Sequence, residues 1–299
     1  MRERTAAVVV NYNDSETTLA QIRRIRDYAA LDRIIVVDNA STDRSLAALR
    51  AVAGGKVTVL AAKRNGGYGA GNNLGIRYAA KKGIQYALIA NPDAEFTASC
   101  LAALVAAMRE NPAIAVLAPV QVNPSHGKAA ELPGSRANVL SGAAAFPLRS
   151  WLPDLLEAGP VARRLFTPLL HYPKSHYRAK LAPVDCVPGS LLLVDIERFL
   201  AAGGYDERVF LYEEEYILGQ RLRRIGAETA LLTTERYLHR HAASIGKSYR
   251  RALDRQRLRE RAMRFYFRHY LGCGRAKLLF TELYFALIRL EIFLTGGGK

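Results

Sequence analysis

Apolar runs of five or six residues recur through the first 120 residues of the chain, and segments with helix signals separate them. Runs of this length, rich in Val and Ile, are typical of buried strands. Strands that alternate with helices predict an α/β fold, with a mostly parallel sheet and helices on both of its faces. In such sheets, ligands bind beyond the carboxyl ends of the strands. The expected strands are Ala6–Val10, Arg33–Asp38, Lys56–Leu60, Gln85–Ala90 and Ile114–Pro119.

Capping residues and helix breakers place the expected helices between these strands. Asp14 or Ser15 can begin a helix that runs to about Tyr28, and Thr42 or Asp43 can begin the next one. Two more helices are expected. One follows the glycine-rich stretch Asn65–Gly75 and ends near Gly83. The other is Thr97–Glu110, and Asn111-Pro112 stops it.

The chain changes character after residue 122. Residues 123–182 hold seven of the twelve prolines and have weak periodicity, which predicts an irregular excursion with short helices. From residue 248 the pattern is helical and amphipathic. We therefore expect one domain over residues 1–247 and a basic helical tail over residues 248–299. The expected elements after residue 150 are helices Trp151–Glu157, Ala162–Leu170 and Glu213–Ile225, and strands Gly189–Ile196 and Glu228–Leu232.

The positive charge of the chain is concentrated near its C-terminus. Lys and Arg number 43 against 27 Asp and Glu, so the formal charge is +16. Twelve of the basic residues and two acids lie between Arg240 and Lys277, a net charge of +10. Such charge suggests nucleic acid, a membrane surface or a phosphate-bearing substrate as the partner. Nucleic acid is disfavoured, because no zinc finger, RNP motif or GXXG clamp occurs and the charge lies outside the expected sheet.

The cysteines and the N-terminus indicate the compartment. Cys100, Cys186 and Cys273 lie far apart and form no CxxC pair, which argues against a zinc ribbon and a disulfide-dense scaffold. The N-terminal segment has no long apolar stretch and no cleavage site of a signal peptide. We expect a cytosolic, reducing setting.

Two acidic loops follow strands of the expected sheet. Asp38 ends one strand, and Asp93 and Glu95 follow another in the segment Asn91–Glu95. Two carboxylates on a loop can hold Mg²⁺ or Mn²⁺ and leave room for phosphate oxygens. The alternative is that these acids cap the helices that follow. Two such loops at one edge of a sheet favour the metal interpretation.

The glycine-rich stretch Asn65–Gly75 brings backbone amides close to whatever binds there, and the helix after it favours an anion. It is neither a GxGxxG motif after the first strand nor a P-loop, since the GK[ST] sequence is missing. A dinucleotide fold and an NTPase are therefore disfavoured. The alternative is a flexible turn.

Carboxylates and histidines gather in the second half of the chain. Glu213, Glu214 and Glu215 are adjacent at the start of a helix, and one of them could have a raised pKa suited to a general base. Otherwise they form a solvated first turn. His239 and His241 could complete a metal shell or touch a diphosphate, although such histidines are more often surface residues.

Taken together, these motifs resemble family 2 glycosyltransferases of the GT-A fold, and within them the bacterial rhamnosyltransferase-like enzymes of surface polysaccharide assembly. The resemblance runs from about Ala6 to Ser248, with the interruption at residues 123–182, which then reads as an acceptor-side excursion. The order and spacing of the motifs carry it. They are Val9–Asn13, Val36–Asp43, Asn65–Asn73, Asn91–Glu95, Pro188–Val194, Gly203–Glu215 and His239–Ser244.

The resemblance implies roles for individual residues. Glu215 would be the base and Glu214 the second choice, because the chain has Glu-Glu where the family has Glu-Asp. Mg²⁺ or Mn²⁺ would be held by Asp93, Glu95 and His239. The nucleotide sugar would contact Asn11, Tyr12, Asn13, Asp38, Arg64, Asn65, Gly66, Asn72 and Asp93. Further positions near the acceptor or the helix after the Glu pair are Gly189, Asp206, Arg221 and His241.

The implied reaction is an inverting, metal-dependent transfer of rhamnose or a similar sugar from a dTDP- or UDP-sugar to a saccharide acceptor that is lipid-linked. Inversion by direct displacement needs a base on the acceptor hydroxyl and a cation on the departing diphosphate. Two alternatives stay open. One is a nucleotidyltransferase with the same acidic metal loop, and the other is a basic nucleic-acid-binding protein.

The C-terminal segment Leu278–Leu294 is apolar but carries Glu282, Arg289 and Glu291. It is too short and too charged for a transmembrane helix, and it suits an amphipathic helix in a membrane interface. Basic residues before it would attract anionic lipid, which places the enzyme at the inner face of the cell membrane. The alternative is a packed C-terminal helix or a contact between two copies in a homodimer.

Overall fold

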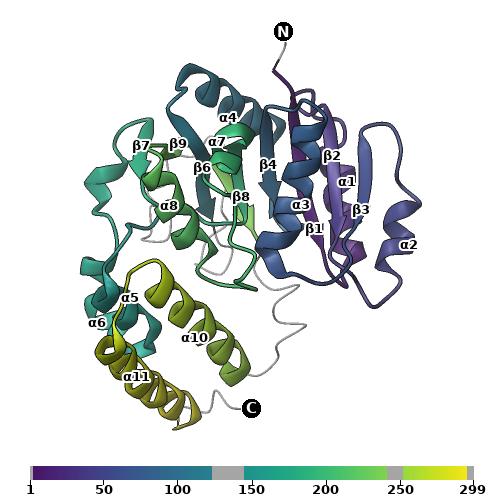
Figure 1. Ribbon diagram of the computed structural model, residues 1–299. Coiled ribbons are helices and arrows are strands. Elements are labelled where there is room, and N and C mark those ends of the chain that lie inside the picture. The colour runs from purple at the N-terminus through teal and green to yellow at the C-terminus, as the bar shows by residue number, and fades with distance from the viewer. Residues whose placement is uncertain (1–2, 123–144, 241–251, 295–299) are drawn as a thin grey trace.

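The computed structural model describes residues 3–122, 145–240 and 252–294, and a nine-stranded sheet lies at its centre (Figure 1). The strand order is β3-β2-β1-β4-β8-β6-β9-β5, and β7 also pairs with β9. The strands are β1 (Thr5–Asn11), β2 (Arg33–Asp38), β3 (Val57–Ala61), β4 (Tyr86–Ala90), β5 (Ala94–Glu95), β6 (Ile114–Val122), β7 (Leu181–Val184), β8 (Leu191–Asp195) and β9 (Glu228–His239).

The direction of the strands confirms the expectation of a mostly parallel sheet. Strands β1, β2, β3 and β4 pair in parallel, and β6 pairs in parallel with β9. Strand β8 lies between β4 and β6 and is antiparallel to both, so β4 and β6 run in the same direction. The six strands that share this direction are β1, β2, β3, β4, β6 and β9. Strands β5 and β7 are antiparallel to β9. The carboxyl ends of the six strands therefore meet at one edge of the sheet, where ligands are expected.

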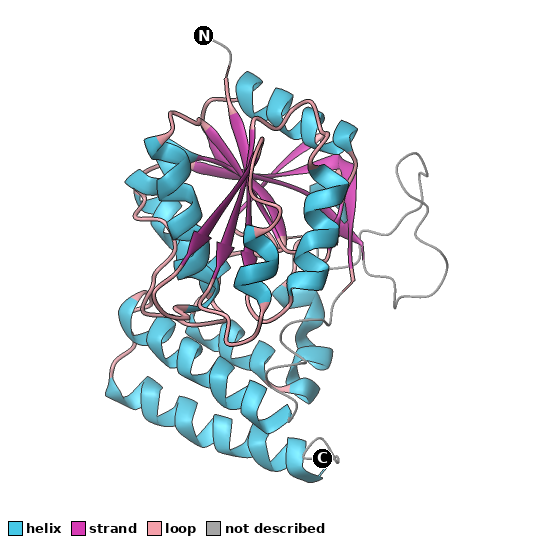
Figure 2. Cartoon of the chain, turned by 90° about the vertical axis from the view of Figure 1, so that its right-hand side faces the viewer, coloured by secondary structure: helices cyan, strands magenta, loops and turns pink. Residues whose placement is uncertain are grey.

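Helices cover both faces of this sheet (Figure 2). On one face, α3, α7 and α8 pack against the strands, and on the other face α1, α2 and α4 do so. The expected strands and helices are all confirmed, with ends that shift by a few residues and a ninth strand that is longer. The helices of this layer are α1 (Ser15–Ile25), α2 (Ser45–Arg50), α3 (Gly67–Lys81), α4 (Ala98–Glu110), α7 (Ile196–Ala201) and α8 (Glu214–Arg224).

The glycine-rich stretch Asn65–Gly75 was expected to precede a helix, but most of it belongs to that helix. Helix α3 begins at Gly67 and lies very close to β1. A Cβ atom at Gly71 would lie 2.8 Å from Val10 Cγ1, and one at Gly75 would lie 2.5 Å from Val8 Cγ1. Glycine costs about 1 kcal/mol in a helix relative to alanine. Here the close helix–strand contact requires it, so the pattern serves packing.

Four more helices lie together beyond the end of the sheet (Figure 1). Side chains of α5, α8, α10 and α11 form a third hydrophobic cluster that includes Leu155, Ile217, Met263, Tyr266 and Phe285. The basic C-terminal segment is therefore packed against the α/β layer. Among the described helices, none has the length and hydropathy that a bilayer crossing requires. These helices are α5 (Trp151–Ala158), α6 (Pro160–Leu170), α10 (Ala252–His269) and α11 (Arg275–Leu294), with a 3₁₀ turn at Lys174–Tyr177.

Candidate active site

The ends of β1 and β2 hold a network of hydrogen bonds around Asp38, which is 1% exposed. Asn11 Nδ2 donates to Asp38 Oδ1 at 2.9 Å, and the Ser41 hydroxyl donates to the same oxygen at 2.6 Å. The Ser41 N–H donates to Asp38 Oδ2 at 3.1 Å, and the Asn13 N–H donates to the Ser41 hydroxyl at 2.9 Å. We call Asn11, Asn13, Asp38 and Ser41 the polar network. It fixes the orientation of one buried carboxyl group.

The start of α3 adjoins the polar network. Asn39 Nδ2 donates to Asn65 Oδ1 at 2.9 Å, and the Gly67 N–H donates to the same oxygen at 3.0 Å. Gly66 precedes the first helical residue, and Arg64 is exposed. Asn72 is buried and donates to the Tyr68 carbonyl within its own helix. Of the residues expected to contact a nucleotide, Asn11, Asn13, Asp38 and Asn65 thus lie in one connected region.

The acidic loop after β4 brings Asp93 to His239, because β5 pairs with the end of β9. Asp93 Oδ1 lies 3.2 Å from His239 Nε2, and both side chains are mostly buried. Glu95 points elsewhere. Its Oε1 lies 3.1 Å from Arg24 Nη2 and 2.6 Å from Arg240 Nε, so two guanidinium groups already neutralise it.

The expected metal set of Asp93, Glu95 and His239 is therefore brought together only in part. Within residues 3–122, 145–240 and 252–294, no group of three His, Cys, Asp or Glu side chains is arranged to hold a metal ion. A carboxylate is the ligand that Mg²⁺ and Mn²⁺ prefer, and imidazole is a common metal ligand. Such ions often take only one or two protein ligands and complete their shell with phosphate oxygens and water. Asp93 and His239 fit an ion held in this open way.

Three adjacent carboxyl groups, Glu213, Glu214 and Glu215, stand at the start of α8, and we call them the glutamate cluster. The Gly189 N–H donates to Glu215 Oε1 at 3.1 Å, and the Tyr68 hydroxyl donates to the Gly189 carbonyl. A Cβ atom at Gly189 would lie 2.9 Å from Glu215 Oε1. A side chain at position 189 would therefore displace this carboxylate from its present position.

Burial raises the pKa of each acid in the glutamate cluster. It raises the pKa of Glu213 to about 8 and that of Glu214 well above its ordinary value, and for Glu214 the adjacent Glu215 adds to the rise. The pKa of Glu215 is raised by burial too, but the N–H groups of Glu215 and Gly189 oppose the rise because they stabilise the carboxylate. Glu214 Oε1 is buried with no hydrogen-bond partner among the described residues. Glu215 is thus the member of the cluster best able to ionise.

A cavity of about 720 Å³ is lined both by the glutamate cluster and by His239, the partner of Asp93. Residues from the sheet edge, such as Asn91 and His239, and the glutamates of α8 line it together. The C-terminal helix α10 contributes to it as well. Further lining residues are Tyr68, Gln121, Phe146, Glu157, Arg163, Pro188, Gly189, Ser190, Leu211, Tyr212, Tyr216, Ala252, Arg255, Gln256 and Arg259.

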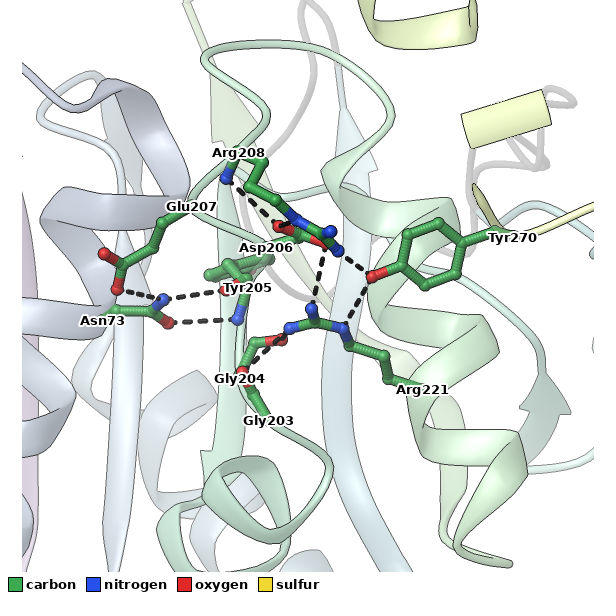
Figure 3. Close-up of polar contacts among 9 residues, drawn as sticks. All are labelled: Asn73, Gly203, Gly204, Tyr205, Asp206, Glu207, Arg208, Arg221 and Tyr270. Atoms are coloured by element: carbon green, nitrogen blue, oxygen red, sulfur yellow. Dashed lines mark hydrogen bonds and ion pairs between the residues drawn. The ribbon is translucent and has the colours of Figure 1, made fainter. Parts of the chain in front are cut away.

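A second network holds the loop before α8 in place (Figure 3). Arg221 Nη2 lies 3.0 Å from Asp206 Oδ2, and the Tyr270 hydroxyl donates to this same oxygen at 2.7 Å. Arg221 Nε donates to the Tyr270 hydroxyl at 2.9 Å, and its Nη1 donates to the carbonyls of Gly203 and Gly204. We call Asp206, Arg221 and Tyr270 the clasp. It ties the segment after α10 to the loop that leads to the glutamate cluster.

The structure separates the predicted site residues into groups. Gly189 contacts Glu215 directly, whereas Asp206 and Arg221 contact each other in the clasp. His241 lies outside the described residues. Sequence reasoning missed several residues of the cavity, among which Tyr68, Arg255 and Arg259 stand out. The spacing of Arg255 and Arg259 could have indicated that they act together, because residues four apart on a helix lie on one face.

The fold and this site define the class of protein. Residues 6–154 match the family model described as glycosyl transferase family 2, and the chain belongs to this family. Its α/β architecture is that of the GT-A glycosyltransferases.

The curated relatives include N-acetylglucosaminyl-diphospho-decaprenol L-rhamnosyltransferases from two strains of Mycobacterium tuberculosis, CDC 1551 / Oshkosh and ATCC 25618 / H37Rv. The chain is 28% identical to each over 167 residues, which cover 54% of this chain and 49% of the relative. The match thus spans about half the length of these relatives.

Solved structures share the fold at low sequence identity. The mannosyltransferase PcManGT from Pyrobaculum calidifontis, in complex with GDP-Man and Mn²⁺, matches with a TM-score of 0.58 at 16% identity. That match covers 97% of this chain and 71% of PcManGT. S. aureus TarS 1-349 matches with a TM-score of 0.52 at 13% identity, over 98% of this chain and 74% of that one.

Proposed function

We propose that this protein is an inverting glycosyltransferase that moves a sugar from a nucleotide diphosphate donor to the hydroxyl of a saccharide acceptor. One observation carries the proposal: a single cavity is lined by Glu215, held by the Gly189 N–H, and by His239, which contacts Asp93. A base and a cation site are the two groups that direct displacement at an anomeric carbon needs. Membership of family 2 favours sugar transfer over nucleotidyl transfer or nucleic-acid binding.

Glu215 acts as the base in this proposal. The acceptor hydroxyl transfers its proton to the Glu215 carboxylate while its oxygen forms a bond to the anomeric carbon of the donor. The bond between that carbon and the diphosphate oxygen breaks on the opposite side, so the configuration inverts and a nucleoside diphosphate leaves. The Gly189 N–H favours the ionised form of Glu215 and orients its carboxylate before the proton arrives.

Asp93 and His239 would hold Mg²⁺ or Mn²⁺ on the donor side. When bound, such an ion neutralises the charge that develops on the departing diphosphate. The polar network around Asp38 would receive the base and ribose of the nucleotide, since Asp38 is fixed at the carboxyl edge of the sheet. Glu95 is left out of the ion's shell here, because Arg24 and Arg240 hold its carboxylate.

The substrates that we propose are a dTDP- or UDP-sugar, with rhamnose or a similar sugar, and a lipid-linked saccharide used in cell-surface polysaccharide assembly. The rhamnosyltransferase name of the mycobacterial relatives supports both the sugar and a diphospho-polyprenol acceptor.

A peripheral contact with the inner face of the cell membrane completes the proposal. Helix α11 exposes apolar side chains along one face, with Leu279, Leu283, Leu287 and Phe293 each more than 60% exposed. The apolar face and the basic residues beside it suit an anionic bilayer surface. The native protein should sediment with anionic vesicles, whereas the Leu283→Asp/Leu287→Asp variant should stay in the supernatant. A dimer that this variant dissociates, without vesicle binding, would assign the face to a second copy.

A panel of nucleotide sugars tests the enzymatic proposal. We expect one class among UDP-, dTDP- and GDP-sugars to raise the unfolding temperature in the presence of Mn²⁺ or Mg²⁺. Incubation of that donor with a lipid-linked acceptor should release the nucleoside diphosphate and form a glycosidic bond of inverted configuration. Release of pyrophosphate from a nucleoside triphosphate, or retention of configuration, would contradict the proposal.

A further inference from the structure

Helix α10 presents two arginines to the candidate active site. Arg255 and Arg259 lie one turn apart, are half-buried and line the same cavity as Glu215 and His239. Arg163 of α6 lines this cavity too. Three guanidinium groups from two helices outside the sheet thus meet the cavity that contains the general base.

The two acids of α10 are engaged with other arginines. Glu260 is 1% exposed, and its Oε2 lies 3.3 Å from Arg264 Nη2 and also contacts Arg289. Asp254 Oδ1 lies 4.0 Å from Arg257 Nη1 on the exposed side of the helix. The carboxylates of this helix therefore interact with the arginines that do not line the cavity.

These arginines gather positive charge on one side of a cavity that the glutamates of α8 also line. Burial lowers the pKa of Arg163, and the positive charges of Arg259 and Arg164 lower it further. Across the cavity, burial raises the pKa of Glu213 to about 8 even though Arg259 opposes the rise, so Glu213 is largely neutral at pH 7. Like charges held together at a cavity wall are relieved by an anion bound between them.

The chemistry of the group identifies the kind of anion. A guanidinium is a planar fork of donors that matches the oxygens of a phosphate, and a pair of forks can hold both phosphates of a diphosphate. The donor diphosphate is already assigned to Asp93 and His239 at the sheet edge. The arginines come from α6 and α10, which lie beyond the end of the sheet, and they line the same cavity as Glu215.

We infer that Arg255 and Arg259, together with Arg163, form a binding site for the phosphate or diphosphate group of the acceptor. This inference rests on the proposed glycosyl transfer, which it deepens by assigning the acceptor's charged group to α10. The site would hold the acceptor so that its hydroxyl faces Glu215. It gives the basic C-terminal segment a role inside the cavity.

Isothermal titration without any sugar donor tests the site. Farnesyl diphosphate, inorganic diphosphate and farnesol are titrated into the full chain in excess EDTA, which keeps a metal-dependent donor site from contributing. We expect Arg255→Gln/Arg259→Gln to weaken farnesyl diphosphate binding at least 10-fold. Arg257→Gln, which removes a charge from the exposed side of the same helix, should leave it unchanged. Arg255→Lys/Arg259→Lys should bind with intermediate affinity, and its unfolding temperature shows whether the fold is kept.

Three results would overturn the inference. The first is equal binding of farnesyl diphosphate by the double Gln variant and the native protein. The second is binding of farnesol as tight as that of farnesyl diphosphate, because the diphosphate would then contribute nothing. The third is an equal loss of UDP binding with Mn²⁺ in the double variant. The last would assign the arginines to the donor. Because this titration uses no sugar transfer, an intact diphosphate site in a protein that transfers no sugar would refute the proposed function alone.

Discussion

Buried carboxyl groups are hydrogen-bonded to different degrees in the polar network and in the glutamate cluster. Asp38 accepts hydrogen bonds on both oxygens, from Asn11 and from Ser41, so its orientation is fixed by neighbours close in space. Glu214 is as deeply placed, yet its Oε1 has no hydrogen-bond partner in the part of the chain that the structure describes, and its pKa is raised. A satisfied carboxylate can recognise a ligand without changing its charge. A poorly satisfied one has a raised pKa and can hold a proton near neutral pH, as Glu214 does beside the better satisfied Glu215.

This difference suggests a division of roles, in which the polar network binds the nucleotide and the glutamate cluster provides the base for the reaction. If the division is correct, substitutions in one region should leave the work of the other intact. The four predictions below test it, from the largest expected effect to the smallest.

Removing the proposed base should have the largest effect. We expect Glu215→Gln to lower kcat by about 10³-fold, because general-base catalysis contributes roughly 10²–10⁴-fold. The amide keeps the shape of the side chain and can still accept from Gly189, so the affinity for the nucleotide should not change. Transfer is measured by product formation, and nucleotide affinity by titration. Glu228→Gln, which removes an exposed carboxylate, serves as the control.

The same assay on Glu214→Gln decides between the two adjacent acids. A larger loss of kcat for Glu214→Gln than for Glu215→Gln would transfer the base role to Glu214. An equal loss of transfer and of nucleotide binding in Glu215→Gln would end the division between the two regions.

Loss of the metal-binding pair should come next. We expect Asp93→Asn to reduce transfer about 100-fold, since a cation supplies several kcal/mol of charge stabilisation in the transition state. Excess EDTA should abolish activity in the native protein, and Mn²⁺ or Mg²⁺ should restore it. Glu95→Gln is the matched control, because Arg24 and Arg240 already hold Glu95 away from Asp93. Full activity in EDTA would remove the metal from the proposal.

The raised pKa of Glu213 predicts a pH dependence of stability. Its pKa is about 8 in the folded protein and near the ordinary value when unfolded, so folding favours the protonated form. The stabilisation is therefore present below the unfolded pKa and is lost as the pH rises through about 8. Between pH 6.5 and pH 9, the native protein should lose about 2 kcal/mol more unfolding free energy than Glu213→Gln. Parallel curves in urea denaturation would show that Glu213 is not buried as described.

The clasp predicts the smallest effect. Tyr270→Phe removes the hydroxyl that donates to Asp206 and accepts from Arg221, which should cost about 1 kcal/mol of unfolding free energy. Because the clasp positions the segment after α10, the KM for the acceptor should rise slightly while donor affinity stays constant. Tyr78→Phe, which removes a hydroxyl outside the clasp, is the control. A change in donor affinity would connect the clasp to the polar network instead.

Much of the fold could be predicted from local patterns. Apolar runs such as Arg33–Asp38 and capping residues such as Thr97 encode elements within a few residues, and Thr97 does accept from the Cys100 N–H. The helix after the glycine-rich stretch was predicted, but its start at Gly67, within the stretch, was not. Local propensity disfavours glycine in a helix, and only the contact of α3 with Val8 and Val10 reverses that preference.

The site was predictable only where its partners are close in sequence or joined by the sheet. Asp38 lies at the end of a predicted strand, and Asp93 follows another. The antiparallel pairing of β5 with β9 then brings Asp93 to His239. The pairing of Glu95 with Arg24 and Arg240 could not be foreseen, because it depends on side chains from three separate elements. The same reason hides the contact between Gly189 and Glu215.

By itself, the sequence determined the alternation of strands and helices, the order of the motifs and the concentration of charge near the C-terminus. Only the tertiary structure decided that α10 packs against α5 and α8 and brings Arg255 and Arg259 to the cavity of Glu215. The physical reason is that the hydrophobic periodicity of a helix indicates only which of its faces is apolar. The surface against which that face packs depends on the packing of the whole chain. The arginines of α10 acquire a defined place in the molecule only through that packing.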